Sequence, residues 1–338
     1  MPGGARPSDR TLRRSGRSRL SWPPPFNPFR IDWNTCTFGQ WEALLARCKR
    51  PTLLQTWQYA LALAKTEGGK ADFGIIHFEN KPVGLVQVQT RRWLPFLTTC
   101  KIYRGPLWIY DEIPGEMLKL VLGMIRQRYH LFRGKPLIFH PEMPDTETAR
   151  KRLKTTGFHR RQDGYESVWL DLTPDVATLR AGLDRKWRNK LNQAERNGLV
   201  VEADTTGRAL DWLMEPYLED KMTRKYRGPS PAFLRVLQQL SADTTPPVVL
   251  RALYHGKAVA GVLLVRHGVA ATYQVGWNGE EGRDLKAHHF LLWQSVLWLK
   301  ETGYTGFDLG GINETTPGIA RFKIGMGGQP FRLVGGYV

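Results

Sequence analysis

Apolar positions along the chain change their spacing from one segment to the next, and each spacing predicts a different element. In residues 41–48 and 55–65 they recur every three or four positions, which predicts two short amphipathic helices. Residues 73–89 instead form two apolar runs separated by Glu-Asn-Lys-Pro at 79–82, a pattern typical of a β-hairpin. The chain is therefore expected to be globular from residue 31 onward.

The hairpin pattern occurs a second time, 176 residues later. Residues 254–262 match residues 78–86 at an aromatic, a lysine and two valines. An apolar helix and then a strand are predicted after each copy, at 116–132 and 136–140 in the first half and at 289–301 and 306–309 in the second. Because the helix of such a unit covers one face of its sheet, the sequence predicts two α+β domains related by internal duplication.

The boundary between the two domains is predicted from a helix start signal. Thr173 can cap a helix and Pro174 suits the first helical turn. The prediction is therefore an N-terminal domain over residues 31–172 and a C-terminal domain over residues 173–338. Residues 1–30, which are rich in Arg, Ser and Pro, are predicted to form a disordered basic tail.

The formal net charge of +18 favours a polyanionic partner. RNA, nucleotide diphosphates and anionic lipid headgroups all fit such a surplus, and a basic surface that only improves solubility is the alternative. The three cysteines show no CxxC spacing, which predicts neither a disulfide framework nor a metal site and favours the cytoplasm. No run of about 18 apolar residues occurs, so no transmembrane segment is predicted.

A strongly basic helix is predicted over residues 184–196, followed by a cap at Asn197-Gly198. One face is apolar and carries Leu183, Trp187, Leu191 and Ala194. The other surface is basic, and together with the basic runs at 150–154 and 221–227 it can track an RNA phosphate backbone. A solvated helix face without a partner is the alternative.

The best candidate for chemistry is the stretch 306–328, in which glycines and a lysine next to an aromatic follow an apolar strand. Asp308, at the strand end, can act as a base or cap the following turn. Lys323, beside Phe322, can polarise an ester carbonyl as negative charge develops in the transition state. The alternative for Lys323 is a surface position on an edge strand.

Several common catalytic motifs are missing, among them GxSxG, the P-loop and HExxH. His288 and His289 point to different sides of any regular element, so they are predicted to be structural. An acetyl-CoA enzyme of the common N-acetyltransferase type would carry an Arg/Gln-x-x-Gly-x-Gly/Ala turn that binds the pyrophosphate, and the nearest segment here, 161–166, fails at its last position. Coenzyme A is therefore the less favoured donor.

Four motifs follow one another in a fixed order: Leu-Gln-Thr-Trp-Gln at 54–58, Tyr-Arg-Gly-Pro-Leu-Trp at 103–108, Ala-Glu-Arg-Asn-Gly-Leu at 194–199, and Phe-Asp-Leu-Gly-Gly-Ile at 307–312 with Arg-Phe-Lys at 321–323. Together they resemble the Fem family of aminoacyl-tRNA-dependent peptidyltransferases, which build interpeptide bridges on peptidoglycan precursors. The resemblance implies two tandem N-acetyltransferase (GNAT)-like domains. It also implies that a peptide amino group attacks the ester of aminoacyl-tRNA and releases the tRNA, with no metal or organic cofactor.

The resemblance also implies roles for particular residues. Lys323 is expected to position or polarise the aminoacyl carbonyl at a catalytic centre that includes Phe322 and Asp308. Arg227 is expected to hold the diphosphate of the acceptor, and the further residues expected to bind substrate are Arg104, Tyr103 and Trp57. The basic helix is expected to contact tRNA through Arg185, Lys186, Arg188 and Lys190.

The expected partners are aminoacyl-tRNA and a peptide or cell-envelope precursor, with an anionic membrane surface as a further candidate for peripheral contact. Two alternatives stay open at this point. One is an acyl-CoA-dependent N-acyltransferase on the same fold, and the other is a non-catalytic RNA-binding relative.

Overall fold

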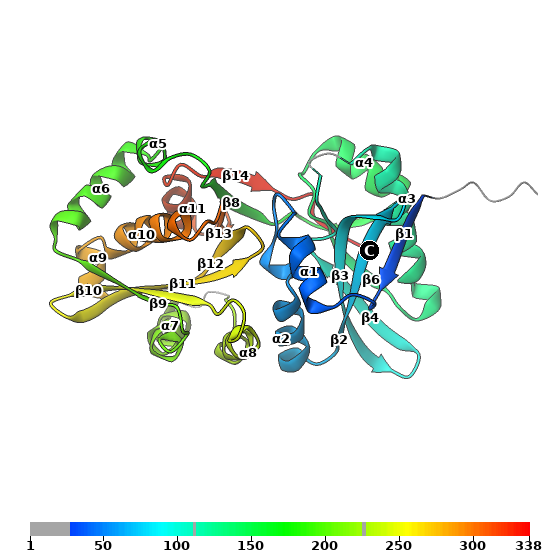
Figure 1. The fold of residues 1–338 in the computed structure, drawn as a ribbon, viewed down its shortest axis with the longest axis horizontal. Helices are drawn as coiled ribbons and strands as arrows, with labels where there is room; N and C mark the ends of the chain where they lie inside the picture. Colours follow the sequence, from blue (N-terminus) through cyan, green and yellow to red (C-terminus); the bar gives the residue numbers. More distant parts are fainter. Residues whose placement is uncertain (1–27, 111–112, 225–227) are drawn as a thin grey trace, which may run out of the picture.

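The computed structural model describes residues 28–110, 113–224 and 228–338. Within these ranges the chain forms two sheets, each covered by helices on both faces (Figure 1). Residues 1–27 lie outside the described part, so the basic tail expected at 1–30 stays a prediction.

The first sheet has the strand order β1-β2-β3-β4-β6-β15-β7, with β5 paired to β3. Helices α1 (Phe38–Leu45) and α2 (Trp57–Glu67) cover one face, and α3 (Gly115–Arg128) and α4 (Glu147–Thr155) cover the other. Two short 3-10 helices, η1 (Leu53–Gln55) and η2 (Leu131–Arg133), precede α2 and β6. The strands are β1 (Phe29–Trp33), β2 (Lys70–Phe78), β3 (Lys81–Leu94), β4 (Leu97–Tyr103), β5 (Leu107–Trp108), β6 (Leu137–His140), β7 (Arg160–Gln162) and β15 (Gly336–Tyr337).

The second sheet has the order β14-β8-β13-β12-β11-β10-β9. One face packs against α5 (Val176–Ala181), α6 (Arg185–Arg196), α10 (Ala287–Glu301) and α11 (Pro317–Ile324), with the short α9 (Glu280–Asp284) beside them. The opposite face packs against α7 (Leu210–Arg224) and α8 (Pro231–Ser241). The strands are β8 (Glu166–Asp171), β9 (Val200–Asp204), β10 (Val248–Tyr254), β11 (Lys257–His267), β12 (Ala270–Asn278), β13 (Gly306–Ile312) and β14 (Gln329–Arg332).

The internal duplication predicted from the sequence is confirmed by the backbone. The first hairpin turns at Glu79 and Asn80, with φ of 46° and 67°, and the second at His255 and Gly256, with φ of 47° and 77°. Two successive residues in the left-handed region define a turn that matches the twist of an antiparallel pair. Each hairpin also has a register shift at the same point, between Ile76 and His77 in one copy and between Ala252 and Leu253 in the other. Both features recur at the predicted spacing.

Helix boundaries follow the capping residues. Helix α1 begins at Phe38, earlier than predicted, because Thr37 and Gln40 form a reciprocal capping box. The helix expected after Thr173 begins only at Val176, since the side chain of Asp175 accepts the Thr178 N–H at 2.6 Å. The prediction that Thr173 caps this helix is therefore wrong. Its hydroxyl donates to Asp171 instead.

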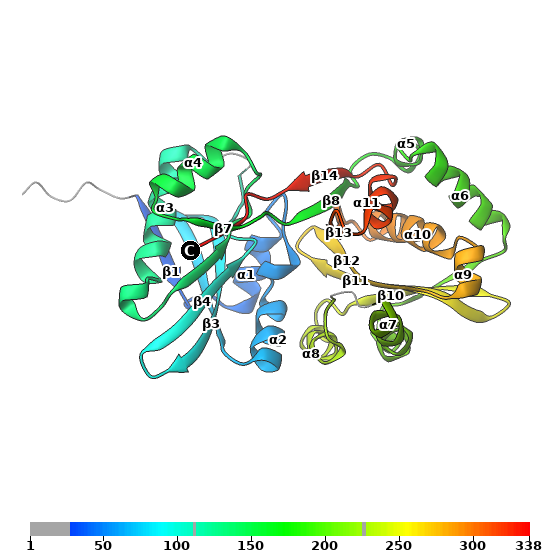
Figure 2. The ribbon, with the colours of Figure 1, turned by 180° about the vertical axis from the view of Figure 1, so that it is seen from behind.

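The two sheets exchange strands across the middle of the chain. β8 lies before the predicted boundary at residues 172/173 but pairs with β13 and β14 of the second sheet. In return, β15 at the other end of the chain pairs with β6 and β7 of the first sheet. The proposed boundary stays a prediction, and the crossing strands connect the two domains (Figure 2).

The domains also share an apolar contact between helices. Residues of η1 and α2 form one buried cluster with α7 and α8, and the rings of Tyr59 and Phe233 meet at 5.0 Å. None of the described helices combines the length and apolar character needed to cross a bilayer.

Candidate active site

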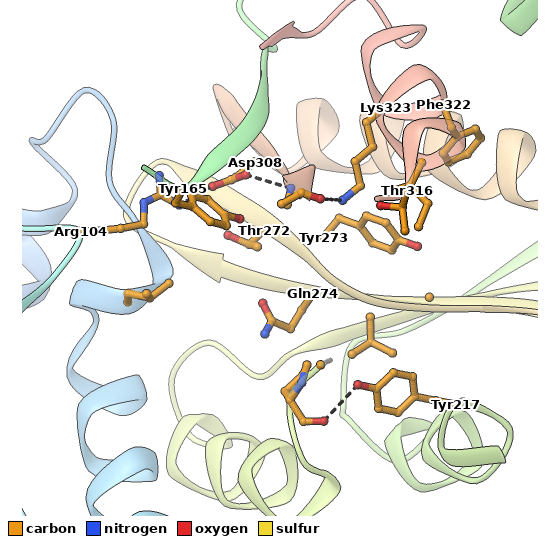
Figure 3. A pocket seen from close by; sticks show the side chains of 18 of the residues that line it. Arg104, Tyr165, Tyr217, Thr272, Tyr273, Gln274, Asp308, Thr316, Phe322 and Lys323 are labelled. Carbon is orange, nitrogen blue, oxygen red and sulfur yellow. Dashed lines mark hydrogen bonds and ion pairs between the residues drawn. The ribbon is translucent and has the colours of Figure 1, made fainter. Parts of the chain in front are cut away.

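A cavity of about 970 Å³ lies between the two domains (Figure 3). The second domain contributes β12, the end of β13, α11 and part of α7 to its wall. The first domain contributes Leu54, Tyr103, Arg104 and the His140–Pro141 segment. Such a position suits a site that must hold two substrates together.

The cavity lies where two parallel strands of the second sheet separate. β12 and β13 pair only at Ala270–Thr272 with Gly306–Asp308. β12 also has a register shift opposite Leu263 and Leu264, which leaves Gln274 without a paired position. Beyond this point, residues 273–276 of β12 and 310–311 of β13 line the cavity. The diverging strands thus open a gap for a ligand between two central strands of the sheet.

Lys323 points into this opening from α11. Its side chain is buried, with 7% exposure, and Nζ donates a hydrogen bond to the Gly311 carbonyl at 2.9 Å. Burial lowers the pKa of Lys323 to about 8, while the charge of Asp308 acts in the opposite direction. The alternative of a surface lysine on an edge strand is therefore wrong, because Lys323 is buried and helical.

Gly310 allows the lysine amine to reach its place. Its φ is +79°, in the left-handed region, and a Cβ there would meet Lys323 Nζ at 3.3 Å and the Tyr273 carbonyl oxygen at 3.1 Å. Gly310, one of the glycines in the stretch 306–328, thus lets Lys323 approach the end of β13.

Phe322 fixes the orientation of α11. Its ring packs edge-on against His289 at 4.9 Å and near Trp187 at 6.0 Å. His288, which also lines the cavity, contacts the Trp277 carbonyl at 3.1 Å, and burial lowers its pKa to about 4. Both histidines therefore pack around the site as neutral rings at physiological pH, since burial likewise lowers the pKa of His289 to about 3.

Asp308 is a fully bonded carboxylate. It accepts hydrogen bonds from Arg104 Nη1 at 2.8 Å, Ser167 Oγ at 2.6 Å and Gly310 N at 2.9 Å. Burial would raise its pKa, but the charge of Arg104 and these hydrogen bonds hold the pKa below its usual range. Because both oxygens are engaged, the geometry suits Asp308 to hold Arg104 and the turn at Gly310 rather than to accept a proton.

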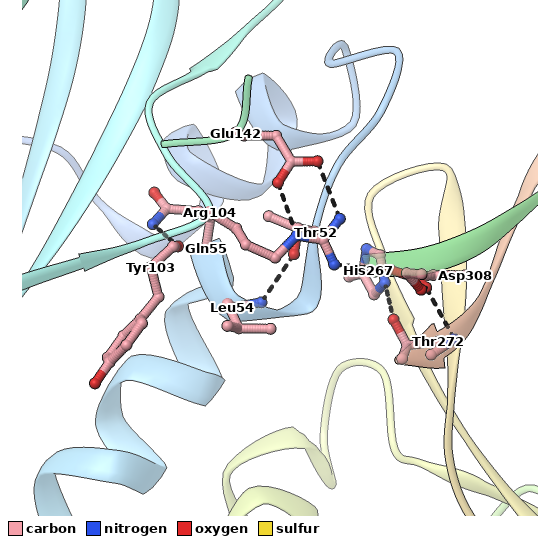
Figure 4. Close-up of polar contacts among 11 residues, drawn as sticks. Thr52, Leu54, Gln55, Tyr103, Arg104, Glu142, His267, Thr272 and Asp308 are labelled. Carbon is pink, nitrogen blue, oxygen red and sulfur yellow. Dashed lines mark hydrogen bonds and ion pairs between the residues drawn. The ribbon is translucent and has the colours of Figure 1, made fainter. Parts of the chain in front are cut away.

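Arg104 connects the two domains through buried ion pairs (Figure 4). Its guanidinium binds Glu142 through Nε at 2.7 Å and Nη2 at 3.0 Å, and Asp308 through Nη1. All three side chains are less than 10% exposed. Arg104 lines the cavity as the sequence predicted a substrate-binding residue to do, yet its nitrogens are occupied by protein carboxylates.

The other residues expected to bind substrate have different positions. Tyr103 lines the cavity and stacks on His140 at 5.6 Å. Trp57 does not line it, because its ring stacks on Phe73 at 3.8 Å within the core of the first domain. Arg227 lies outside the described residues. These substrate-binding roles stay predictions.

Gln55, from the same motif as Trp57, is a residue that the sequence reasoning missed. Its Nε2 donates to the Tyr103 carbonyl at 2.8 Å, and its Oε1 accepts the Gln87 N–H at 2.8 Å. It therefore holds the loop that carries Tyr103 and Arg104. Its membership of the motif at 54–58 was the available signal.

Several polar side chains of the cavity carry no sequence motif. They come from both domains and are brought together only by the fold. These side chains are Tyr165, Tyr217, Thr272, Tyr273, Gln274 and Thr316. Thr272 contacts His267 Nε2 at 2.8 Å, and burial lowers the pKa of His267 to about 3. Three of these six polar side chains thus come from β12.

The basic helix forms as predicted, from Arg185 to Arg196, with its expected apolar face buried. Arg185, Lys186 and Lys190 are exposed, and Arg188 is half-buried. Figures 1 and 2 place this helix, α6, at the end of the second domain that faces away from the first. The basic run on α4 belongs to the first domain, so the two runs lie on different domains.

Comparisons with known proteins agree with this architecture. Residues 181–323 match the family described as an acetyltransferase (GNAT) domain. The chain resembles the crystal structure of FemX with a TM-score of 0.77 at 15% identity, over 90% of this chain and 96% of FemX. The protein has a Fem-like tandem GNAT fold. The matched domain is an acyltransferase domain, and the protein is therefore an acyltransferase.

Two further solved structures share the tandem arrangement. A conserved protein of unknown function from Bacteroides thetaiotaomicron VPI-5482 has a TM-score of 0.58 at 12% identity, over 91% of this chain and 98% of that one. A tandem GNAT protein from the clavulanic acid biosynthesis pathway has a TM-score of 0.51 at 14% identity, over 91% and 98% of the two chains. No curated protein sequence matches the chain. The tandem GNAT fold expected from the sequence is confirmed.

Proposed function

We propose that the protein transfers an amino acid from aminoacyl-tRNA to an amino group of a peptide or cell-envelope precursor. The observation that carries the proposal is the amine of Lys323, held inside an interdomain cavity at the point where β12 and β13 separate. The likeness to FemX supports the fold for such a transfer, and the exposed basic surface of α6 supports an RNA-bound donor.

The reaction makes specific demands on the site. The nitrogen lone pair of the acceptor attacks the ester carbonyl carbon, and negative charge develops on the carbonyl oxygen. The bond to the tRNA ribose oxygen then breaks, the amide forms, and the proton released by nitrogen ends on the ribose hydroxyl. An ammonium placed before the carbonyl arrives stabilises this charge most where water is excluded. Lys323, buried and already oriented by the Gly311 carbonyl, fits that role.

An acyl-CoA donor is the second candidate, and the GNAT domain match favours it. Two observations weigh against it. The nearest pyrophosphate-like segment, 161–166, connects β7 to β8 and opens no helix, so its amides lack the alignment that binds phosphate. The first turn of α9, after β12, carries Glu280 and Glu281, which repel a diphosphate.

Initial rates of transfer with radiolabelled aminoacyl-tRNAs and with acyl-CoA, each with amine-bearing peptide acceptors, test the donor. We expect amide formation from aminoacyl-tRNA. Charge reversal of Arg185, Lys186 and Lys190 to glutamate should weaken tRNA retention on filters by about tenfold or more and lower its salt dependence, because three phosphate contacts are lost.

The matched control for this experiment is a triple charge reversal elsewhere, Arg91→Glu/Arg133→Glu/Lys135→Glu, on the first domain. It should leave tRNA retention unchanged. Transfer from acyl-CoA but from no aminoacyl-tRNA would contradict the proposed donor. RNA retention without transfer from any donor would instead indicate a non-catalytic RNA-binding protein.

The pH dependence of transfer provides a separate prediction. Because the pKa of Lys323 is lowered to about 8, its ammonium is present below that pH and is lost above it. We therefore expect kcat to fall as the pH rises through about 8. In Lys323→Arg the guanidinium stays charged, so the remaining activity should lack this descending limb. The same limb in both proteins would show that another group titrates.

A further inference from the structure

Five exposed apolar side chains, among them Phe132, the most exposed large apolar side chain of the described residues, lie on two neighbouring segments of the first domain. One is the tip of the β3–β4 hairpin, with Trp93, Leu94 and Phe96. The other is the η2 turn, with Leu131 and Phe132. Backbone hydrogen bonds join the two segments, since Thr98 N donates to the Gly134 carbonyl at 2.7 Å and Cys100 N donates to the Pro136 carbonyl at 2.9 Å. We call these five side chains the apolar tip.

The exposure of the apolar tip is unusual for a protein surface. Phe132 is 93% exposed, Phe96 75%, Leu131 64% and Trp93 58%. Single exposed apolar residues need no explanation, but a contiguous group at the ends of two loops marks an interaction site. The hairpin end lies at the lower margin of the first domain in both views (Figures 1 and 2). The side chains of the apolar tip are therefore accessible to a partner surface.

The two segments that carry the apolar tip are basic. Residues 91–97 and 126–135 contain six Lys or Arg and no Asp or Glu. Arg91 lies over the Trp93 ring at 4.3 Å, and Arg133 and Lys135 are exposed. A hollow of about 340 Å³ beside Phe132 is lined by Arg126, His130 and Arg133, which suit a phosphate.

From this arrangement we infer that the apolar tip inserts into the surface of an anionic lipid bilayer. Aromatic and leucine side chains enter the boundary between headgroups and acyl chains, while the surrounding cations stay at the level of the lipid phosphates. The inference concerns a surface away from the interdomain cavity, and it requires neither a particular donor nor a particular acceptor.

Two other occupants fit the surface less well. A second copy of the chain, seated on the same patch, would bring Arg91, Arg133 and Lys135 against the same three cations, and like charges in close apposition oppose association. RNA would satisfy the cations and can stack on Trp93, but it would leave Leu94 and Leu131 facing a polar backbone. A bilayer satisfies both the apolar and the charged parts.

Co-sedimentation of the full-length protein with vesicles tests the inference. At about 150 mM salt, binding to vesicles of phosphatidylcholine and phosphatidylglycerol should exceed binding to pure phosphatidylcholine. Phe96→Ser/Phe132→Ser should weaken partitioning to the mixed vesicles by about tenfold or more, because two inserted rings are lost. Arg91→Glu/Arg133→Glu/Lys135→Glu should remove the preference for phosphatidylglycerol.

The matched control is Val200→Ser, which removes an exposed apolar side chain from β9 in the second domain and should leave partitioning unchanged. Thermal unfolding of each variant checks that the fold is intact. The inference would be overturned if Phe96→Ser/Phe132→Ser bound the mixed vesicles as strongly as the wild-type protein does. It would also be overturned by a loss of tRNA retention in that variant with vesicle binding intact, which would assign the apolar tip to RNA.

Discussion

Replacement of Arg104 by methionine is expected to lower the free energy of unfolding by about 3–5 kcal/mol. Methionine can fill much of the space of the arginine stem, but it carries no charge. The carboxylates of Glu142 and Asp308 are then buried without their partner. Urea unfolding at neutral pH measures the change. Because Arg104 joins residues from both domains, the domain interface should be weakened together with the global stability.

The control for this result is an exposed ion pair of similar geometry. Arg235 Nε contacts Asp211 at 2.7 Å, yet both side chains are more than half exposed. Arg235→Met should therefore change stability by less than about 1 kcal/mol. The double variant Arg104→Met/Asp308→Asn should recover part of the loss, since it removes one stranded charge. A loss no larger for Arg104→Met than for Arg235→Met would contradict the proposed strength of the buried pair.

Replacement of Lys323 by methionine is expected to reduce kcat by about 100- to 1000-fold, the usual effect of removing one donor that stabilises a developing oxyanion. The free energy of unfolding should change little, because two effects oppose each other. The variant loses the hydrogen bond to the Gly311 carbonyl, but it also no longer buries a charged ammonium group. Single-turnover transfer from aminoacyl-tRNA measures the chemical step, and urea unfolding measures the stability.

Lys300 is the matched control for Lys323. It also donates to carbonyl oxygens, those of Leu172 at 2.6 Å and Pro174 at 2.5 Å, but it does not line the cavity. Lys300→Met should therefore lower stability while the kcat of the folded enzyme stays near the wild-type value. Equal losses of kcat in both variants would mean that Lys323 acts through the fold and not on the reaction.

The parts of the fold that could be predicted are those with a local cause. Each hairpin was visible because turn-forming residues separate two apolar runs, and the duplication followed from their spacing. The face of α6 was visible because Trp187, Leu191 and Ala194 recur at helical intervals. Such patterns record which neighbours within a segment must be buried together.

The parts that could not be predicted depend on contacts between distant segments. Arg104 and Asp308 were both candidates, but their pairing spans 204 residues and has no sequence signal. Trp57 was expected at the site because of its motif. An aromatic residue in a motif can equally pack in the core, and Trp57 does so by stacking on Phe73. The helix α11 was missed because Gly318 within it and Gly325 directly after it are typical of turns.

The strand exchange between the sheets has a consequence for the order of synthesis. β7 has β15 as its partner in the first sheet, and β15 is translated only after the whole second domain. The first domain thus cannot complete its sheet as it leaves the ribosome, although it is made first. The pairing of β7 must wait until β15 has been made, so the first sheet reaches its final strand order only after the second domain has been synthesised.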